Sequence, residues 1–257
     1  MMRLIHDLPH LSLTLVWACL AWVLTIFTAC DYKELCYNHP HKKTAQVMVP
    51  VNWSKFTEEQ PTGMTVMVFP DDGSAPQTVL SNYLGSAEFA LKPGVHHILV
   101  FNQSTSEFGS LHFEGMDQYS TARVLANSYV SRWYKSRGDE DRAIAEPEWL
   151  AHGGLDEVLV TDGMIHSDSV YVTDTVKPRN VVYTIHIRIH VKGIYNVRSA
   201  RASLNGMAEG YLFATGKPSE SRIAQLLEKW TLTADADNPA NGVLSADIQS
   251  FGLPSGH

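Results

Sequence analysis

Cys30 is the residue with the most specific chemistry in this sequence, and it follows a 19-residue, largely apolar stretch from Leu11 to Ala29. A positive charge at Arg3, an apolar segment and a small residue before the cleavage point are what a secretory signal peptide requires. Bacterial lipoprotein processing attaches diacylglycerol to a cysteine directly after that point, and two or more acyl chains hold a protein firmly on a membrane. We therefore expect residues 1–29 to be a lipoprotein signal peptide and Cys30 to be the lipid attachment site.

Two features of residues 1–29 leave a second interpretation open. Phe27 stands where an aliphatic residue is usual in a lipoprotein signal, and Asp7 opposes the charge of Arg3. The second interpretation is an uncleaved membrane anchor, because the apolar stretch nearly reaches the ~20 residues that span a bilayer. A buried helix of a soluble domain fits the segment least well.

His39 and His41, close to Cys36, form the cluster that most suggests a metal site. Imidazole and thiolate groups both bind metals such as zinc. A closed zinc site would need a fourth ligand, and a polar tether rarely holds ligands in a fixed geometry. We therefore expect these residues to belong to the tether, and we expect no metal and no cofactor.

Two further histidine pairs are expected to lie within strands. His186 and His190 fall on one face with Arg188 between them, which favours surface packing across strands over a metal site. His96 and His97 are adjacent and therefore point to opposite faces of a strand, so they cannot form a site by themselves.

No motif in the sequence is typical of catalysis. The G-x-S-x-G nucleophile elbow and a glycine-rich phosphate loop are both missing. Glycosidic cleavage would require paired carboxylates, but those of this chain occur where Asp and Asn favour turns through local hydrogen bonds. These pairs are Asp71-Asp72, Asp139-Glu140-Asp141 and Asp235-Ala236-Asp237-Asn238. We predict that the protein is not an enzyme.

Charge and cysteine content exclude two further classes. The formal net charge is −7 at pH 7, and removing residues 1–29 takes away Arg3 and Asp7 and leaves it unchanged. Nucleic-acid binding normally requires clustered Lys and Arg, so we exclude it. Of the three cysteines, Cys19 leaves with the signal peptide and Cys30 carries lipid. Cys36 would be the single remaining thiol, so no disulfide can form within one mature chain, and its role stays open.

The elements that would position these residues are mostly strands. Residues 30–43 are polar and without periodicity, as expected of a tether. Residues 44–178 are expected to form an N-terminal β-sandwich. Within it, residues 64–69 are apolar apart from Thr65, and residues 96–102 place apolar side chains on both faces of a strand.

Residues 179–257 are expected to form a C-terminal β-sandwich. Strict alternation from Val181 to Lys192 predicts a strand with one core face and one solvated face, and the preceding Pro178 marks the domain boundary. Asn205-Gly206 predicts a turn. Residues 219–230 have apolar side chains at helical spacing, which favours a short amphipathic helix, with a strand as the alternative.

The C-terminal β-sandwich offers about four strand candidates, whereas a sandwich usually has about seven. We infer that this sandwich is truncated in the given sequence. The alternative is a small second domain.

Several motifs stand in an order that one group of proteins shares. They are the run from Cys30 to His41, the strand ending at Trp53, Val66 to Gly73, Lys92-Pro93-Gly94, Val100-Phe101-Asn102, and Ala202 to Ala208. In these motifs, over most of residues 30–252, the chain resembles uncharacterised Bacteroidales lipoproteins of the fimbrillin superfamily. The resemblance implies an all-β fold of two tandem transthyretin-like β-sandwich domains, an outer-membrane, lipid-anchored location at the cell surface, and kinship with fimbrial shaft, tip and anchor subunits. It implies no catalytic residues.

Two functions from different classes follow. The first is a fimbrial or adhesin-type structural subunit that joins other fimbrial subunits by strand addition and contacts the membrane through its lipidated N-terminus. The second is a surface lipoprotein that binds a glycan or another host ligand, with Trp133, Tyr134 and Trp149 on a platform where sugars stack. Core or interface packing would explain these aromatic residues equally well. We favour the structural subunit, and the sequence identifies neither its ligand nor its position in a filament.

Overall fold

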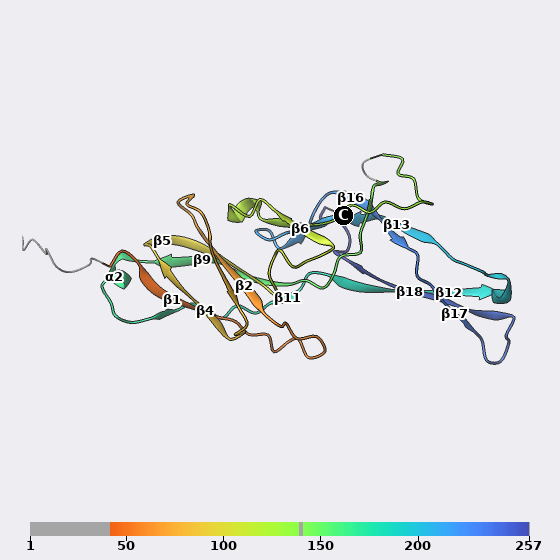
Figure 1. Cartoon of the computed structure of the whole chain (residues 1–257), viewed down its shortest axis with the longest axis horizontal. Coiled ribbons are helices and arrows are strands. Elements are labelled where there is room, and N and C mark those ends of the chain that lie inside the picture. Colours follow the sequence, from red (N-terminus) through yellow and green to blue (C-terminus); the bar gives the residue numbers. More distant parts are fainter. Residues whose placement is uncertain (1–41, 139–140, 257) are drawn as a thin grey trace, which may run out of the picture. The chain divides into compact units, whose positions relative to one another are not determined.

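The structure, a computed structural model, describes residues 42–138 and 141–256, and nearly all of its regular elements are strands (Figure 1). The predicted all-β fold class is confirmed. The helical segments in these ranges include η1 (Tyr119–Thr121), α2 (Asp162–Ile165) and η3 (Ile194–Asn196). None of the helices in the described ranges is long and apolar enough to cross a membrane.

One five-stranded sheet contributes to two hydrophobic cores. In spatial order its strands are β11 (Arg179–Asn180), β9 (Ala151–Val160), β5 (Gly94–Phe101), β2 (Met64–Pro70) and β3 (Gln77–Ser81). Val66 of β2 and Ile98 of β5 belong to the first core, whereas Met67 and Leu99 belong to the second. A strand buried on both faces has a nearly continuous apolar sequence, which explains residues 64–69, where the one polar residue, Thr65, donates its hydroxyl to the Gln103 backbone oxygen at 2.8 Å.

The first core lies between this sheet and a three-stranded sheet. The three strands are β10 (Tyr171–Val172), β1 (Ala45–Pro50) and β4 (Ser86–Leu91), with β1 in the middle. β1 and β4 run antiparallel, and their alternate residues, such as Val47, Val49, Phe89 and Leu91, are buried in this core. One face of each of these two strands therefore packs against the core.

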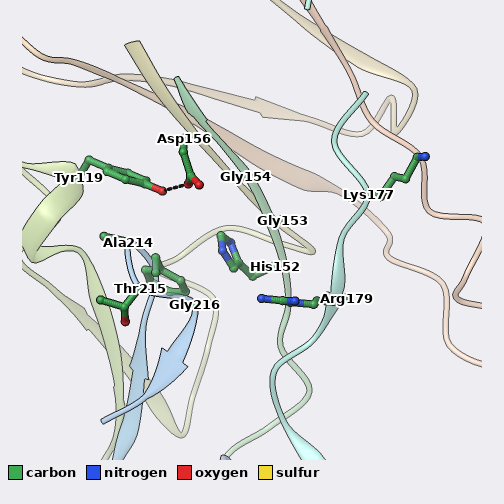
Figure 2. Close-up of a pocket in the computed structure, with 11 residues that line it drawn as sticks. Tyr119, His152, Gly153, Gly154, Asp156, Lys177, Arg179, Ala214, Thr215 and Gly216 are labelled. Atoms are coloured by element: carbon green, nitrogen blue, oxygen red, sulfur yellow. Dashed lines mark hydrogen bonds between the residues drawn. The ribbon is translucent and has the colours of Figure 1, made fainter. Parts of the chain in front are cut away.

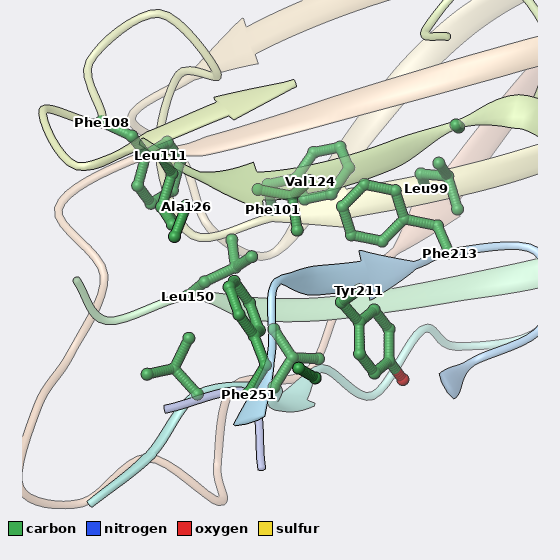
Figure 3. Packing of buried hydrophobic residues seen from close by; sticks show 14 of the residues in the cluster. Leu99, Phe101, Phe108, Leu111, Val124, Ala126, Leu150, Tyr211, Phe213 and Phe251 are labelled. Carbon is green, nitrogen blue, oxygen red and sulfur yellow. The ribbon is translucent and has the colours of Figure 1, made fainter. Parts of the chain in front are cut away.

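The second core is larger and rich in aromatic side chains (Figure 3). Phe101 of β5 lies 5.4 Å from Phe113 and 4.9 Å from Phe213 between ring centroids, in edge-to-face arrangements. A four-stranded sheet contributes to this core, with the order β15 (Lys217–Pro218), β14 (Gly210–Leu212), β7 (Arg123–Ala126) and β6 (Leu111–Glu114). Aromatic pairs of this geometry contribute about 0.5–1.5 kcal/mol each beyond their buried area.

Strands from both sides of residue 178 share this second core. β14 pairs with β7, and Tyr211, Phe213 and Phe251 pack in the same cluster as Leu99 and Phe101. The parallel pairing of β8 (Ala143–Ile144) with β16 (Arg222–Leu227) also joins residues from the two sides. The domain bounds expected from the sequence are 44–178 and 179–257, and they stay a prediction. The shared second core is the feature that a test of these bounds has to address.

The remaining strands form two three-stranded sheets that contact each other through a small third core. One sheet has the order β13 (Ala202–Ala208), β16 and β8, and the other has the order β12 (Tyr183–Lys192), β18 (Asn241–Ser250) and β17 (Thr231–Ala234). Among the described residues, the buried members of this third core are Leu227, Ala246 and Ile248.

Two local expectations for this region are wrong. The segment favoured as a helix contains strand β16, because Ile223, Ala224, Gln225 and Leu227 are buried by neighbours on both faces, so the apolar spacing reflects two-sided burial. The Asn205-Gly206 pair makes no turn. It forms a bulge within β13, where Gly206 has a φ of 78°, a conformation that glycine adopts without steric cost.

The alternating strand predicted from residue 181 is confirmed as β12, but its apolar face is only partly covered. Ile185 and Ile187 pack against the third core, whereas Ile189 on the same face is 45% exposed. β12 lies at the edge of its sheet, with β18 as its single bonded neighbour over ten residue pairs. The outer edge and the far part of the apolar face of β12 are therefore open.

Candidate functional site

Some of the candidate site residues from the sequence lie outside the residues that the structure describes. These are Cys30, Cys36, His39 and His41. Lipid attachment at Cys30 therefore stays a prediction. Among the residues that the structure describes, no group of three or more His, Cys, Asp or Glu side chains could hold a metal ion.

The strand histidines occupy the positions expected of them. His186 lies opposite Asp247 in the β12–β18 ladder, and its Nδ1 is 2.8 Å from the Asp247 carboxylate, so this pair packs across strands on the surface. His96 is buried with its Nε2 2.8 Å from the backbone oxygen of Lys92. His97 points to the other face and stacks on Tyr119 at 4.4 Å between ring centroids.

The described carboxylate pairs occupy turns, as predicted. The Asp72 carboxylate accepts a hydrogen bond of 2.9 Å from the Ser74 backbone N–H, and hydrogen bonding from Ser74, first from its side chain and then from this N–H, lowers the pKa of Asp72. Asp235 accepts a similar bond of 3.1 Å from the Asp237 N–H. Residues 139 and 140 of the remaining group, Asp139-Glu140-Asp141, lie outside the described ranges.

The aromatic residues considered as a sugar platform have packing partners of their own. The Glu228 carboxylate accepts hydrogen bonds from the Trp133 indole N–H, the Ser131 hydroxyl at 3.0 Å and the Tyr129 hydroxyl at 3.1 Å. Tyr134 meets Trp133 edge-on, with ring planes at 79°.

Trp149 has different neighbours from this group. It packs edge-on against Phe56, and its indole N–H donates to the Asn180 side chain at 2.8 Å. The three aromatic residues therefore do not present one flat stacking surface.

A polar pocket of about 350 Å³ brings together basic, acidic, phenolic and imidazole side chains (Figure 2). We call it the Arg179 pocket. Its lining residues are Tyr119, His152, Gly153, Gly154, Asp156, Lys177, Arg179, Phe213, Ala214, Thr215 and Gly216.

Strand geometry positions the charged and polar groups of the Arg179 pocket. His152 and Gly154 occupy alternate positions of β9, so they share one face of the strand, and Asp156 follows where the pairing of β9 with β5 shifts register. Arg179 of β11 lies directly opposite His152 in the antiparallel register. The segment 213–216 and η1 complete the lining, so the pocket draws on distant parts of the sequence.

His152 is buried between aromatic rings and is neutral at physiological pH. Its ring lies 4.8 Å from that of Phe213 and 5.6 Å from that of Phe101 between centroids. Burial, the main cause, lowers the pKa of His152 to about 4, and the charge of Arg179 also lowers it, while the Val100 backbone and Asp156 act in the opposite direction. Its Nδ1 atom is buried without a hydrogen-bond partner.

Tyr119 and Asp156 form the opposite wall of the pocket. The Tyr119 hydroxyl donates a hydrogen bond of 2.5 Å to the Asp156 carboxylate (Figure 2). Burial and this bond raise the pKa of Tyr119, so its hydroxyl keeps its proton. His97 stacks on the Tyr119 ring and fixes its orientation.

Arg179 has spare hydrogen-bonding capacity. Its Nη2 donates to the Tyr211 hydroxyl at a long 3.4 Å, and no carboxylate pairs with it within the described part of the chain. Gly216, with a φ of 65°, leaves room for the guanidinium, because a Cβ there would lie 3.2 Å from Nη2. Lys177 is also on the rim, but its ammonium group points away from the pocket (Figure 2).

Sequence reasoning missed the Arg179 pocket because its residues come from η1, β9, β11 and the 213–216 turn. One signal was present in β9, where a glycine pair interrupts a strand between His152 and Asp156. Glycine within a strand often marks a close backbone approach or a site.

Known proteins similar to this chain are linked to fimbriae and adhesion. A family model, DUF5119, described as a domain of unknown function, matches residues 29–228. A candidate fimbrium anchoring subunit, Fim4B of Bacteroides ovatus, is 20% identical over 194 residues, which are 76% of this chain and 54% of that protein. The chain thus spans about half the length of this curated relative.

Solved structures share the fold at low sequence identity. A candidate adhesin from Bacteroides ovatus has a TM-score of 0.61 at 18% identity, over 89% of this chain and 72% of that chain. The fimbrial anchor protein Mfa2 from Porphyromonas gingivalis has a TM-score of 0.52 at 15% identity, over 82% of this chain and 74% of that chain. The resemblance to fimbrillin-type proteins inferred from the sequence is confirmed.

Proposed function

Because this chain belongs to the DUF5119 family, we propose that it is a cell-surface structural subunit of a fimbrium, of the anchor or adhesin type, with no catalytic activity. The relative named as a candidate fimbrium anchoring subunit supports this role. We propose further that Cys30 carries the lipid that holds the chain at the outer membrane, and that the chain joins a neighbouring subunit by strand addition.

The open edge of β12 is the observation that carries the assembly proposal. A long edge strand presents a row of unpaired backbone N–H and C=O groups, which is a template for a strand from another chain. β12 is ten residues long and has one bonded neighbour. Its apolar face includes the exposed Ile189, so an added strand could bury apolar side chains as well as satisfy the backbone.

The opposite face of β12 explains why such an edge need not cause aggregation. His186, Arg188 and His190 project from that face and are exposed. Charged and polar side chains on an edge strand discourage pairing with unselected partners. The apolar face of β12 therefore favours a partner strand with a matching apolar face, and its polar face disfavours pairing with unrelated strands.

The test compares Ile189→Lys with the matched control Thr184→Lys, which adds the same charge on the polar face of β12. Both full-length variants are expressed in a fimbriated Bacteroidales host, recovered from membranes by an affinity tag, and analysed for co-purified fimbrillin-type subunits by mass spectrometry. We expect Ile189→Lys to lose at least tenfold of the captured subunit and Thr184→Lys to retain it. Equal capture by both variants, with equal melting temperatures, would refute assembly through β12.

A further inference from the structure

We propose that the Arg179 pocket binds a hydroxylated carboxylate of the size of one sugar ring, such as a uronic acid. Its volume of about 350 Å³ is within the range of small-ligand sites. The polar groups that line it lie on two sides of His152, with Arg179 on one side and the Tyr119–Asp156 pair on the other (Figure 2). The binding goes beyond the assembly role proposed above and does not depend on it.

Arg179 supplies the carboxylate-binding group. A guanidinium presents parallel N–H donors that match the two oxygens of a carboxylate, and such bidentate pairs are stronger than neutral hydrogen bonds. In this structure those donors have one long bond to Tyr211 and no anionic partner among the described residues. Gly216 keeps the space beside the guanidinium free of a side chain.

The Tyr119–Asp156 pair supplies the hydroxyl-binding group. The Asp156 carboxylate accepts one bond from Tyr119, and a carboxylate has about four lone-pair sites, so it can accept further bonds from ligand hydroxyls. A simple anion would meet repulsion from Asp156. A ligand that carries both a carboxylate and hydroxyl groups satisfies the two sides together.

His152 lies between the two charges and is neutral. Its Nδ1 is covered by protein atoms and has no partner, so the bonds to a ligand fall to Arg179 and Asp156. The imidazole lines the pocket as a surface without charge. Because the ring is enclosed by aromatic side chains, its position is fixed before a ligand arrives.

Calorimetric titration of the full chain in detergent micelles at pH 7 tests the proposal. The probes are D-glucuronate, its methyl glycoside, D-glucose as the neutral analogue, and acetate as a carboxylate without hydroxyls. We expect saturable binding of glucuronate, with glucose and acetate at least tenfold weaker. If the methyl glycoside binds as tightly as glucuronate, the natural ligand is a terminal sugar of a glycan. If glucuronate binds and the methyl glycoside does not, the natural ligand is a free sugar acid.

Substitutions assign the binding to the pocket. Arg179→Gln should weaken glucuronate binding at least tenfold, Arg179→Lys should weaken it less, and the exposed control Arg188→Gln should leave it unchanged. The assembly variant Ile189→Lys should bind glucuronate normally, which separates this proposal from the proposed function. If glucuronate does not bind, or if it binds equally to Arg179→Gln with an unchanged melting temperature, the proposal is wrong.

Discussion

Arg179 lies directly opposite His152 on neighbouring antiparallel strands, so a guanidinium and a buried imidazole share one face of a sheet. Residues in this relationship have closely spaced side chains. The imidazole is therefore held neutral by burial and, to a smaller degree, by the adjacent positive charge. Burial and the neighbouring guanidinium make the protonation of His152 unfavourable in the folded state. The free energy of unfolding should therefore depend on pH.

His152 should make the protein less stable in acid. Its pKa is lowered from 6.5 to about 4, so the unfolded chain binds a proton at a higher pH than the folded chain does. The free energy of unfolding therefore decreases as the pH falls from 6.5 through 4, by on the order of 3 kcal/mol for the complete shift. Urea unfolding at pH 7 and pH 4 should show a smaller loss for His152→Phe than for the wild type. An equal loss in both proteins would contradict the assignment.

Glu228 should hold the segment 129–133 against β16. Hydrogen bonds from Trp133, Ser131 and Tyr129 lower the pKa of Glu228, so this contribution is present at neutral pH and is lost as the pH falls through that lowered pKa. Glu228→Gln replaces the charge-assisted bonds with weaker ones. We expect faster amide exchange across residues 129–133 in this variant, measured by mass spectrometry, and no change in the exposed control Glu220→Gln. Unchanged exchange in Glu228→Gln would show that other contacts hold the segment.

The shared second core should keep a nicked chain together. We expect limited proteolysis to cut near residues 135–138, where the chain is exposed. The fragments should remain associated on size-exclusion chromatography, because Tyr211, Phe213 and Phe251 pack among residues of the N-terminal fragment. They should separate in urea. Release of a compact fragment from residue 44 to 178 without denaturant would instead support the domain boundary predicted at residue 178.

Cys30→Ala should abolish incorporation of labelled palmitate and leave a precursor of higher mass. The reason is that lipoprotein processing requires the thiol before cleavage can follow. Metabolic labelling and intact-protein mass spectrometry in a bacterial host provide the measurement, with Cys36→Ala as the control that should still be labelled. Labelling that survives in Cys30→Ala would exclude this cysteine as the lipid attachment site.

The strands that could be predicted from the sequence are those whose pattern has a single physical cause. β12 alternates because the two faces of its ladder differ, and β2 is apolar at nearly every position because both of its faces are buried. Residues 219–230 misled the prediction because two-sided burial in β16 placed apolar residues at positions 223, 226 and 227, which is also helical spacing. Periodicity alone does not distinguish these cases in a short segment.

The Arg179 pocket could not be predicted in the same way. Tyr119, His152 and Arg179 come together only when η1, β9 and β11 meet, and no local spacing records that contact. β9 itself was missed because Gly153 and Gly154 weaken a strand pattern. A register shift in its pairing with β5 also breaks the alternation near residue 156. At Gly206 the sequence misled in the opposite direction. The Asn205-Gly206 pair is typical of turns, but here it forms a bulge within a strand.

Burial of β5 on both faces limits how its sequence can change over evolutionary time. Ile98 and Val100 fill one core while Leu99 and Phe101 fill another, and all four are fully buried. A large-to-small substitution at any of them removes contacts and leaves a cavity, at a cost of about 1–5 kcal/mol. Neither the odd-numbered nor the even-numbered positions of β5 therefore tolerate substitution in this stretch. In β12, by contrast, alternate residues are exposed. Related sequences should therefore differ at those alternate positions of β12 before they differ at consecutive positions of β5.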